Sequence, residues 1–256
     1  MEQELLVNPQ SEIRDPQLEK KEAAMSDRDR GQRGITVVGV LVVVVILIGL
    51  AFLLWPTFKR LTQGSLEAIC TNNLRQIGVC LGEYEQDNQG VVPPAQSCAE
   101  GSSQVVLWNQ ALEKYLLRHG GESLLHCPAK SLTTIGYAVN YRVFGYGVPG
   151  IPQPKLVTAD KVRSPRETIY ALDTGIITED TKSLEDPLKW KEEIKDRDGR
   201  PLDAPVLCRC TKDKLWDQYP WRPMPRHNGK VNCLMLEGNV EALSVEEILK
   251  SREGVR

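Results

Sequence analysis

The stretch that decides the fold is residues 28–60, RDRGQRGITVVGVLVVVVILIGLAFLLWPTFKR, in which a short basic segment runs through Gly34 directly into an apolar run. Residues 34–58 contain no charged side chain. About 20 apolar residues, each adding about 1.5 Å to a helix, span a hydrocarbon core of about 30 Å. We therefore predict a transmembrane helix over residues 35–58.

A cleaved secretory signal is the first alternative for this run. The apolar region of such a signal is about 7 to 15 residues long and ends at a small-x-small cleavage site. The run here is longer and ends in Leu54, Trp55 and Pro56, with the aromatic residue where the membrane interface would lie. A membrane anchor is therefore favoured, and the three arginines of residues 28–33 favour a cytoplasmic N-terminus over the flank of Lys59 and Arg60.

The chain divides into four predicted parts. Residues 1–34 are highly charged and are expected to form a flexible cytoplasmic leader, in which Met25 is an alternative start. After the transmembrane helix, residues 59–92 are expected to continue the same helix in amphipathic form and to end at NQGVVPP. Apolar residues recur there at steps of one, three or four: Leu66, Ile69, Cys70, Leu74, Ile77, Leu81 and Tyr84.

Residues 93–256 are predicted to form a small α+β domain with a mainly antiparallel sheet. A helix is expected over residues 105–121 with Gly120 as its stop, strands within 136–147 and 167–175, and mostly loop over 178–219. Two terminal strands, 230–236 and 239–243, are expected to be joined by Glu237 and Gly238 in a type I′ turn. Ser244 and Glu247 have the spacing of a capping box that opens a last helix.

Charge and motifs exclude some classes of function. The formal net charge is −2 and the two signs are mixed beyond the apolar run, so no basic face for nucleic acid is expected. No serine or cysteine nucleophile motif accompanies His227. Because His227 precedes Asn228-Gly229, it is interpreted as a turn or packing residue, and we predict that the chain is not an enzyme.

All seven cysteines follow the apolar run, which predicts disulfides if that side of the membrane is oxidising. The pairing stays open, with five candidates: Cys98, Cys127, Cys208, Cys210 and Cys233. A zinc set of Cys208, Cys210, His227 and Cys233 has suitable residue types but matches no common spacing.

Acidic residues offer a second candidate metal site. Asp173, Glu179 and Asp180 could suggest calcium, but without a known loop pattern a solvated acidic loop is favoured. With disulfides favoured over zinc, we predict neither a metal nor a cofactor.

Several segments together resemble a known family. The basic leader, the Gly34-Ile35 boundary and the apolar helix resemble the processing site of type IV prepilins and of type II secretion pseudopilins. CTNNLRQIGVCLGEYEQDNQGVVPP, CPA at Cys127, VRSPRETIYALDTG and RHNGKVNCLMLEGNV resemble segments of a large pilin-like family with a terminal H-x9-D-G signature, here His227, Glu237 and Gly238. The resemblance covers most of residues 34–243.

The resemblance implies cleavage after Gly34 by a prepilin peptidase, methylation of Ile35, and assembly with other pilin-like subunits through the N-terminal helix. It implies a single-pass protein of the inner membrane with an extracytoplasmic C-terminal domain. Two residues depart from the pattern: Gly39 replaces a glutamate that meets the terminal amine of a neighbouring subunit, and Glu237 replaces aspartate. Because Gly39 removes that contact, a minor or tip subunit is expected. The alternative is an uncleaved, membrane-anchored binding or zinc-containing domain.

Overall fold

The computed structural model describes residues 37–98, 103–130, 135–150, 155–193, 198, 207–208 and 221–250. The chain divides into two units, Met1–Thr57 and Phe58–Arg256. The first unit is described by its helical residues alone. The leader and the Gly34-Ile35 boundary lie outside the described residues.

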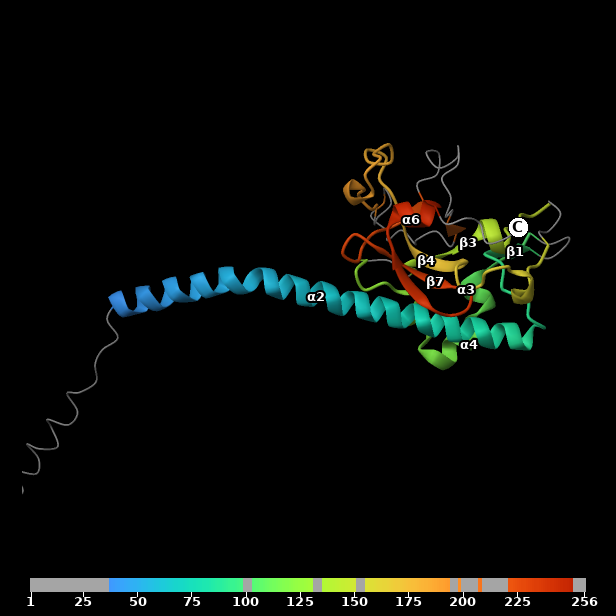
Figure 1. Cartoon of the computed structure of the whole chain (residues 1–256), viewed down its shortest axis with the longest axis horizontal. Helices are drawn as coiled ribbons and strands as arrows, with labels where there is room; N and C mark the ends of the chain where they lie inside the picture. Colours follow the sequence, from blue (N-terminus) through green and yellow to red (C-terminus); the bar gives the residue numbers. More distant parts are fainter. Residues whose placement is uncertain are drawn as a thin grey trace, which may run out of the picture. The chain divides into compact units, whose positions relative to one another are not determined.

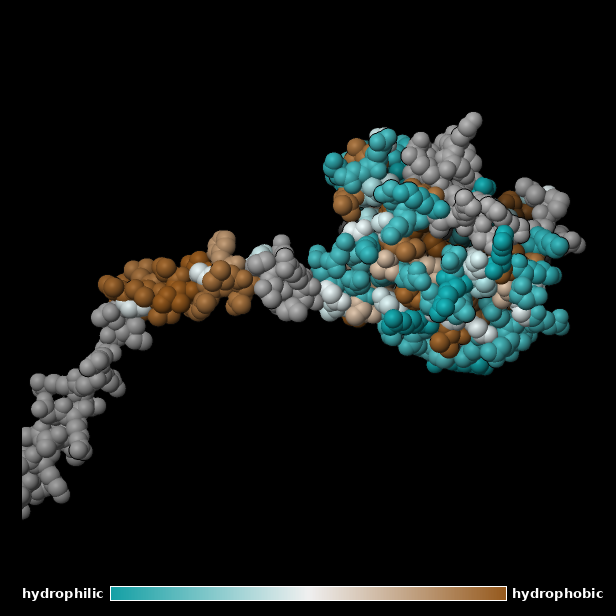
Figure 2. Space-filling model, in the orientation of Figure 1, coloured by the Kyte–Doolittle hydropathy of each residue, from teal (hydrophilic) through white to brown (hydrophobic). Residues whose placement is uncertain are grey.

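A single helix, α2 (Val37–Asp87), runs for 51 residues and carries the chain from one unit into the other. Its Val37–Trp55 portion has a mean hydropathy of 3.4 and no buried residue. Figure 2 shows this portion covered by hydrophobic side chains on the face in view. It is the one helix among the described residues that is long and apolar enough to cross a membrane.

The second half of α2 has one buried face, as the apolar spacing predicts, but Ile69 of the predicted stripe is exposed. Leu74, Ile77 and Leu81 are almost fully buried in the main core of the domain. The helix ends at Asp87, and the left-handed backbone of Gln89 and Gly90 turns the chain away from its axis. The helix therefore ends directly before NQGVVPP and short of the predicted bound at residue 92. In Figure 1 this half of α2, coloured cyan to green, lies along the sheet domain.

The domain is built on a six-stranded sheet in the order β5-β3-β4-β7-β8, with β6 paired to β4. All of its pairs are antiparallel except that of β3 with β5. The predicted α+β class with a mainly antiparallel sheet therefore agrees with the structure. The strands of this sheet are β3 (Tyr137–Asn140), β4 (Ile169–Ile176), β5 (Leu207–Cys208), β6 (Trp221–Pro223), β7 (Val231–Met235) and β8 (Val240–Leu243).

A two-stranded sheet and short helices complete the domain. The small sheet pairs β1 (Gln96–Cys98) with β2 (Val105–Leu107). The short helices are α3 (Trp108–Ala111), α4 (Glu113–His119), η2 (Gly121–Leu125), α5 (Tyr141–Phe144), η3 (Ala159–Lys161), η4 (Pro187–Lys189) and α6 (Val245–Lys250).

Two predicted elements differ from the structure at their edges. The helix expected over 105–121 begins only at Trp108, because Val105 to Leu107 pair with β1 as strand β2. Its stop at Gly120 is confirmed. The segment 136–147 forms a strand only to Asn140 and then turns into α5.

The connection between β7 and β8 is not the predicted two-residue type I′ turn. The N–H of Gly238 donates to Met235 O at 2.9 Å, and the N–H of Met235 donates to Asn239 O at 2.8 Å, so three residues form the loop. Only Gly238 there has positive φ, +95°. A type I′ turn needs positive φ at both central residues, which is unfavourable for Glu237 with its Cβ.

The predicted capping box at the start of α6 is confirmed. The backbone N–H of Ser244 donates to Glu247 Oε2 at 2.7 Å, and the N–H of Glu247 donates to Ser244 Oγ at 3.2 Å. Two of the donors that a helix start leaves unpaired are thereby satisfied.

Candidate functional site

Four side chains of metal-binding types, from four distant segments, meet inside the domain. They are Cys70, Cys127, Asp173 and His227, and we refer to them as the buried cluster. One donor atom from each lies within 4.8 Å of the other three, and all four residues are buried. Buried polar groups normally have specific hydrogen-bond partners. The contacts of each of the four side chains therefore determine which ligand the cluster could bind.

Cys70 comes from the inward face of α2 and is fully buried. The hydroxyl of Tyr137 on β3 donates to Cys70 Sγ at 3.2 Å. One turn further along the helix, Asn73 Nδ2 donates to His126 O at 3.0 Å and ties α2 to the residue before Cys127. The helix and the Cys127 segment are therefore joined beside the cluster.

Cys127 is presented by a turn that follows η2. The N–H of Lys130 donates to Cys127 O at 2.9 Å, and Pro128 occupies the second position of this turn, where its restricted φ is favoured. Gly136 passes so close that a Cβ there would lie 2.7 Å from Cys127 Cβ. Only glycine therefore fits at position 136. The backbone of Gly136 packs directly against Cys127 and helps to hold its side chain in place.

Asp173 lies in the middle of β4 and has no exposed surface. The backbone N–H of Asn232 on β7 donates to Asp173 Oδ2 at 3.0 Å. Arg226 Nη1 lies 3.9 Å from Asp173 Oδ1. The earlier expectation that Asp173 belongs to a solvated acidic loop is wrong, although Glu179 and Asp180 are exposed.

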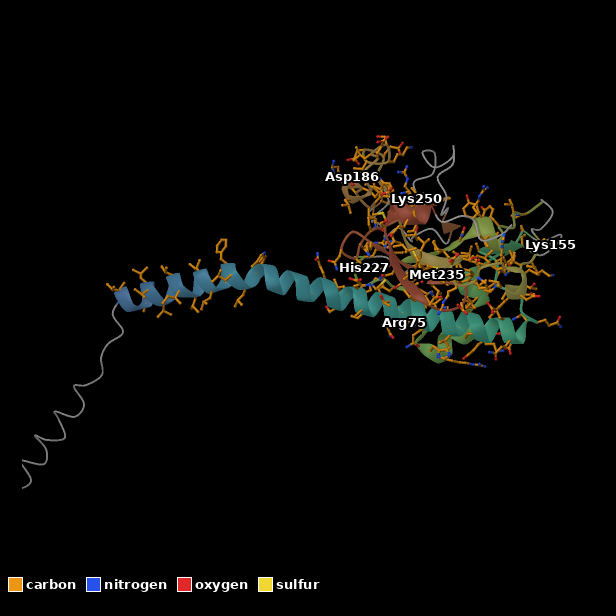
Figure 3. The ribbon with its side chains drawn as sticks, in the orientation of Figure 1. Arg75, Lys155, Asp186, His227, Met235 and Lys250 are labelled. Carbon is orange, nitrogen blue, oxygen red and sulfur yellow. The ribbon has the colours of Figure 1, made fainter. Side chains whose placement is uncertain are left out.

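His227 is held by a tight two-residue turn before β7. The N–H of Lys230 donates to His227 O at 2.9 Å and the N–H of His227 donates to Lys230 O at 3.2 Å. Between them Asn228 and Gly229 both have positive φ, as a type I′ turn requires. Asn228 Nδ2 also donates to Glu67 Oε2 of α2 at 2.9 Å. Figure 3 labels His227, in the turn before β7, and Met235, the last residue of β7.

The donor atoms of the cluster lie at short and similar separations. Cys70 Sγ is 3.2 Å from Asp173 Oδ1, Cys127 Sγ is 3.5 Å from His227 Nε2, and His227 Nε2 is 3.4 Å from Asp173 Oδ2. Cys127 and Asp173 thus approach the same imidazole nitrogen. In a catalytic triad the carboxylate would instead orient the ring through Nδ1, so the geometry differs from that of a Cys-His-Asp nucleophile.

Proximity and burial change the protonation of the cluster. The hydrogen bond between the two thiols lowers the pKa of Cys127 and raises the pKa of Cys70. Burial raises the pKa of Asp173 to about 7. Burial lowers the pKa of His227, but the hydrogen bond to Cys127 and the charge of Asp173 outweigh it and leave that pKa raised. A thiolate on Cys127 is therefore favoured beside a charged imidazole.

Three charged side chains, Arg226, Glu192 and Lys130, form an ion-pair group beside the cluster. Arg226 Nη2 donates to Glu192 Oε1 at 2.6 Å, and Lys130 Nζ lies 3.3 Å from the same oxygen. Two cations thus share one carboxylate, which leaves one net positive charge next to the buried cluster. That charge favours anionic forms of the cysteines and of Asp173.

The cysteines named as disulfide candidates have separate positions. Cys127 is a free thiol in the cluster, as is Cys70. Cys98 is buried on β1, and Cys233 is buried on β7, where its Sγ lies 3.6 Å from Val231 O. Cys208 is placed in β5 by its backbone alone, and Cys210 lies outside the described residues. His227 therefore meets Cys70 and Cys127, and no other cysteine whose side chain the structure describes belongs to the cluster.

The other two signature residues lie at the β7–β8 turn and not at the cluster. Glu237 is on the surface, with Oε2 3.4 Å from Arg166 Nε. Gly238 lies against α2, because a Cβ added to Gly78 would be 3.4 Å from Gly238 Cα. The turn therefore packs on the helix through its glycine, with the carboxylate on the outside.

Reasoning from the sequence missed Cys70 as a member of a site, because Cys70 was assigned to the apolar stripe of α2. It considered Asp173 only together with Glu179 and Asp180, and not with the cysteines or His227. A signal was nevertheless present, since four of the segments quoted for the family resemblance each contain one member of the cluster. Comparisons with models of protein families, with curated proteins and with solved structures found no match to this chain.

Proposed function

We propose that this protein is a pilin-like subunit, minor or at the tip, of a type II secretion or type IV pilus-like assembly. One observation carries the proposal: α2 changes from fully exposed and apolar over Val37–Trp55 to one-faced and buried in the domain at Leu74 and Leu81. A subunit that assembles through its helix needs an apolar half free of its own domain. It also needs a second half attached to that domain.

Assembly exchanges lipid contacts of the apolar half for helix contacts. Both surroundings are apolar, so van der Waals packing between helices is the driving term. The sequence supports maturation of the N-terminus, because the basic leader ends at Gly34-Ile35 directly before the apolar run. Gly39 has no carboxylate to pair with the amine of a neighbouring subunit, which favours a terminal position over a repeated one.

The test is the N-terminal residue and intact mass of the full chain, produced in cells with and without their prepilin peptidase. We expect a chain that begins at N-methylated Ile35 only when the peptidase is present. Gly34→Leu should abolish this processing. Gly31→Leu, three residues earlier in the leader, should leave it unchanged and serves as the matched control. A chain that retains residues 28–34 in both strains overturns the proposal.

A second candidate function is an uncleaved, membrane-anchored domain that binds a ligand or metal. The buried cluster is the observation that favours it, because four donor side chains meet within the Phe58–Arg256 unit. The same mass measurement distinguishes the two functions, since only the pilin-like subunit loses its leader.

A further inference from the structure

We propose that Cys70, Cys127, Asp173 and His227 form a structural Zn²⁺ site that ties helix α2 to the sheet. The inference goes beyond the proposed assembly function, because the site lies in the domain and does not depend on cleavage at Gly34. The donor set is two sulfurs, one imidazole nitrogen and one carboxylate oxygen. Zn²⁺ accepts all three kinds of ligand in a four-coordinate site.

The separations between donor atoms agree with a tetrahedral zinc site. Zn–S bonds of about 2.3 Å and Zn–N or Zn–O bonds of about 2.0–2.2 Å place neighbouring ligand atoms roughly 3.3–3.8 Å apart. Three separations are close to these values: 3.2 Å from Cys70 Sγ to Asp173 Oδ1, 3.4 Å from His227 Nε2 to Asp173 Oδ2, and 3.5 Å from Cys127 Sγ to His227 Nε2. The four donor atoms all lie within 4.8 Å of one another. Small side-chain movements would therefore be enough to coordinate the ion.

The direction of the ligands also favours a metal over hydrogen bonding alone. Cys127 Sγ and Asp173 Oδ2 both approach His227 Nε2. A proton on that nitrogen can point well at only one of them, whereas a metal ion bound by its lone pair can contact both. Calcium and magnesium do not fit, because these ions require six or more oxygen ligands or retained waters.

Contacts around the cluster have the character of an outer shell of a metal site. Tyr137 donates to Cys70 Sγ, and the Asn232 N–H donates to Asp173 Oδ2, leaving the other lone pairs of these atoms for the ion. Two thiolates, one carboxylate and Zn²⁺ carry one net negative charge. The one net positive charge of Arg226 and Lys130 against Glu192 balances it.

Burial makes the site structural and not catalytic. Each of the four side chains has almost no exposed surface, so all four positions are occupied by protein and none is open to water or substrate. The ligands come from α2, the turn after η2, strand β4 and the turn before β7. The ion would therefore join distant segments at one point: Cys70 and Asp173 are 103 residues apart in sequence, and Cys127 and His227 are 100 apart.

The first experiment measures zinc in the full chain, produced with zinc in the medium and extracted in mild detergent. We expect about one zinc ion per chain by elemental analysis. Cys70→Ser, Cys127→Ser, Asp173→Asn and His227→Gln should each lower the zinc content at least severalfold. Cys80→Ser, another buried thiol of α2, and His119→Gln are matched controls that should keep it.

Variants that fail to fold would lose zinc for a trivial reason, so a second measurement uses the unaltered chain. Replacing zinc by Co²⁺ should produce thiolate-to-cobalt charge-transfer absorption and the intense d–d bands of a tetrahedral site. Adding zinc should remove both signals. A chelator should lower the thermal midpoint of the wild-type chain and of Cys80→Ser alike.

Three results would overturn the proposal. One is substoichiometric zinc together with no tetrahedral cobalt spectrum in a folded, reduced chain. Another is a Cys70–Cys127 disulfide in the natively produced protein, visible as a peptide pair joined through these two residues in a digest without reductant. The third is zinc that persists in Cys70→Ser and Cys127→Ser but is lost when Cys208 and Cys233 are changed. None of these results bears on processing at Gly34.

Discussion

The two halves of α2 share one backbone helix but differ in what surrounds them. Over Val37–Trp55 the side chains are apolar in every direction and none is buried by protein. From Leu74 to Leu81 one face of the helix is buried in the core of the domain, and the other face is exposed, Val79 included. Backbone geometry alone does not indicate whether a helix is surrounded by lipid or packs on protein. The distribution of apolar residues around the helix axis indicates which of the two applies.

The largest effect should come from placing one charge in each half. Ile46→Asp should reduce membrane integration, because an aspartate at the centre of a membrane helix costs about 2.5–3.5 kcal/mol, and should leave the domain folded. Leu74→Asp should do the reverse, since an unpaired buried carboxylate destabilises the core by several kcal/mol. Membrane fractionation and near-ultraviolet circular dichroism of the full chain measure the two effects. Domain unfolding by Ile46→Asp would contradict the comparison.

A smaller change tests the two faces of the second half. Leu74→Ala should lower the free energy of unfolding by about 2–5 kcal/mol, because it leaves a cavity in the core. Ile69, on the same half of the helix, is 49% exposed, and Ile69→Ala should lower it much less. Urea unfolding of the full chain in detergent measures both. Equal losses would show that the buried face is assigned wrongly.

Glu85, in the second half of α2, makes the stability of the domain depend on pH. The apolar half has no ionisable side chain with such an effect. Its Oε1 is buried and has no hydrogen-bond partner among the described residues, and burial raises the pKa of Glu85 from 4.5 to about 7. The folded state therefore holds the proton more tightly than the unfolded state, so stability is full below about pH 4.5 and falls as pH rises through 7.

Glu85→Gln should remove this loss. After allowance for partial exposure, we expect a gain of roughly 1–2 kcal/mol at pH 8 and little change at pH 4. Urea unfolding at the two pH values measures the effect. A pH dependence that is unchanged in the variant would mean that Glu85 stays ionised and solvated in the folded protein.

The smallest effects distinguish two glycines of the second half that are four residues apart. A Cβ at Gly82 would meet nothing within 4 Å, so Gly82→Ala should stabilise the domain by about 0.5–1 kcal/mol through helix propensity. A Cβ at Gly78 would lie 3.0 Å from Leu234 Cδ1 and 3.4 Å from Gly238 Cα. Gly78→Ala should therefore gain less or destabilise. If the two variants changed the free energy of unfolding by the same sign and size, the β7–β8 turn would not pack closely on α2.

The two tight turns near the end of the chain show why part of the fold could not be predicted locally. Asn228-Gly229 and Glu237-Gly238 both suit a short hairpin connection, and the second was the predicted type I′ turn. The structure has positive φ at both central residues only at Asn228-Gly229. At Glu237 the loop takes one more residue, Leu236, whose N–H donates to Thr168 O. A contact distant in sequence thus determined the length of the loop.

The sequence by itself determined the helix, its change of character and its end, because hydrophobic period and helix-stop residues act within a few turns of the chain. It also determined the capping box at Ser244, and it supplies the cysteine, aspartate and histidine side chains of the buried cluster. Only the tertiary structure decided which of the described cysteines meet. Cys70 has the spacing of a core residue, and Asp173 lies in a predicted strand with no local sign of a partner. Their meeting with Cys127 and His227 depends on the register of β4 with β7 and on the packing of α2 over them, which no local pattern encodes.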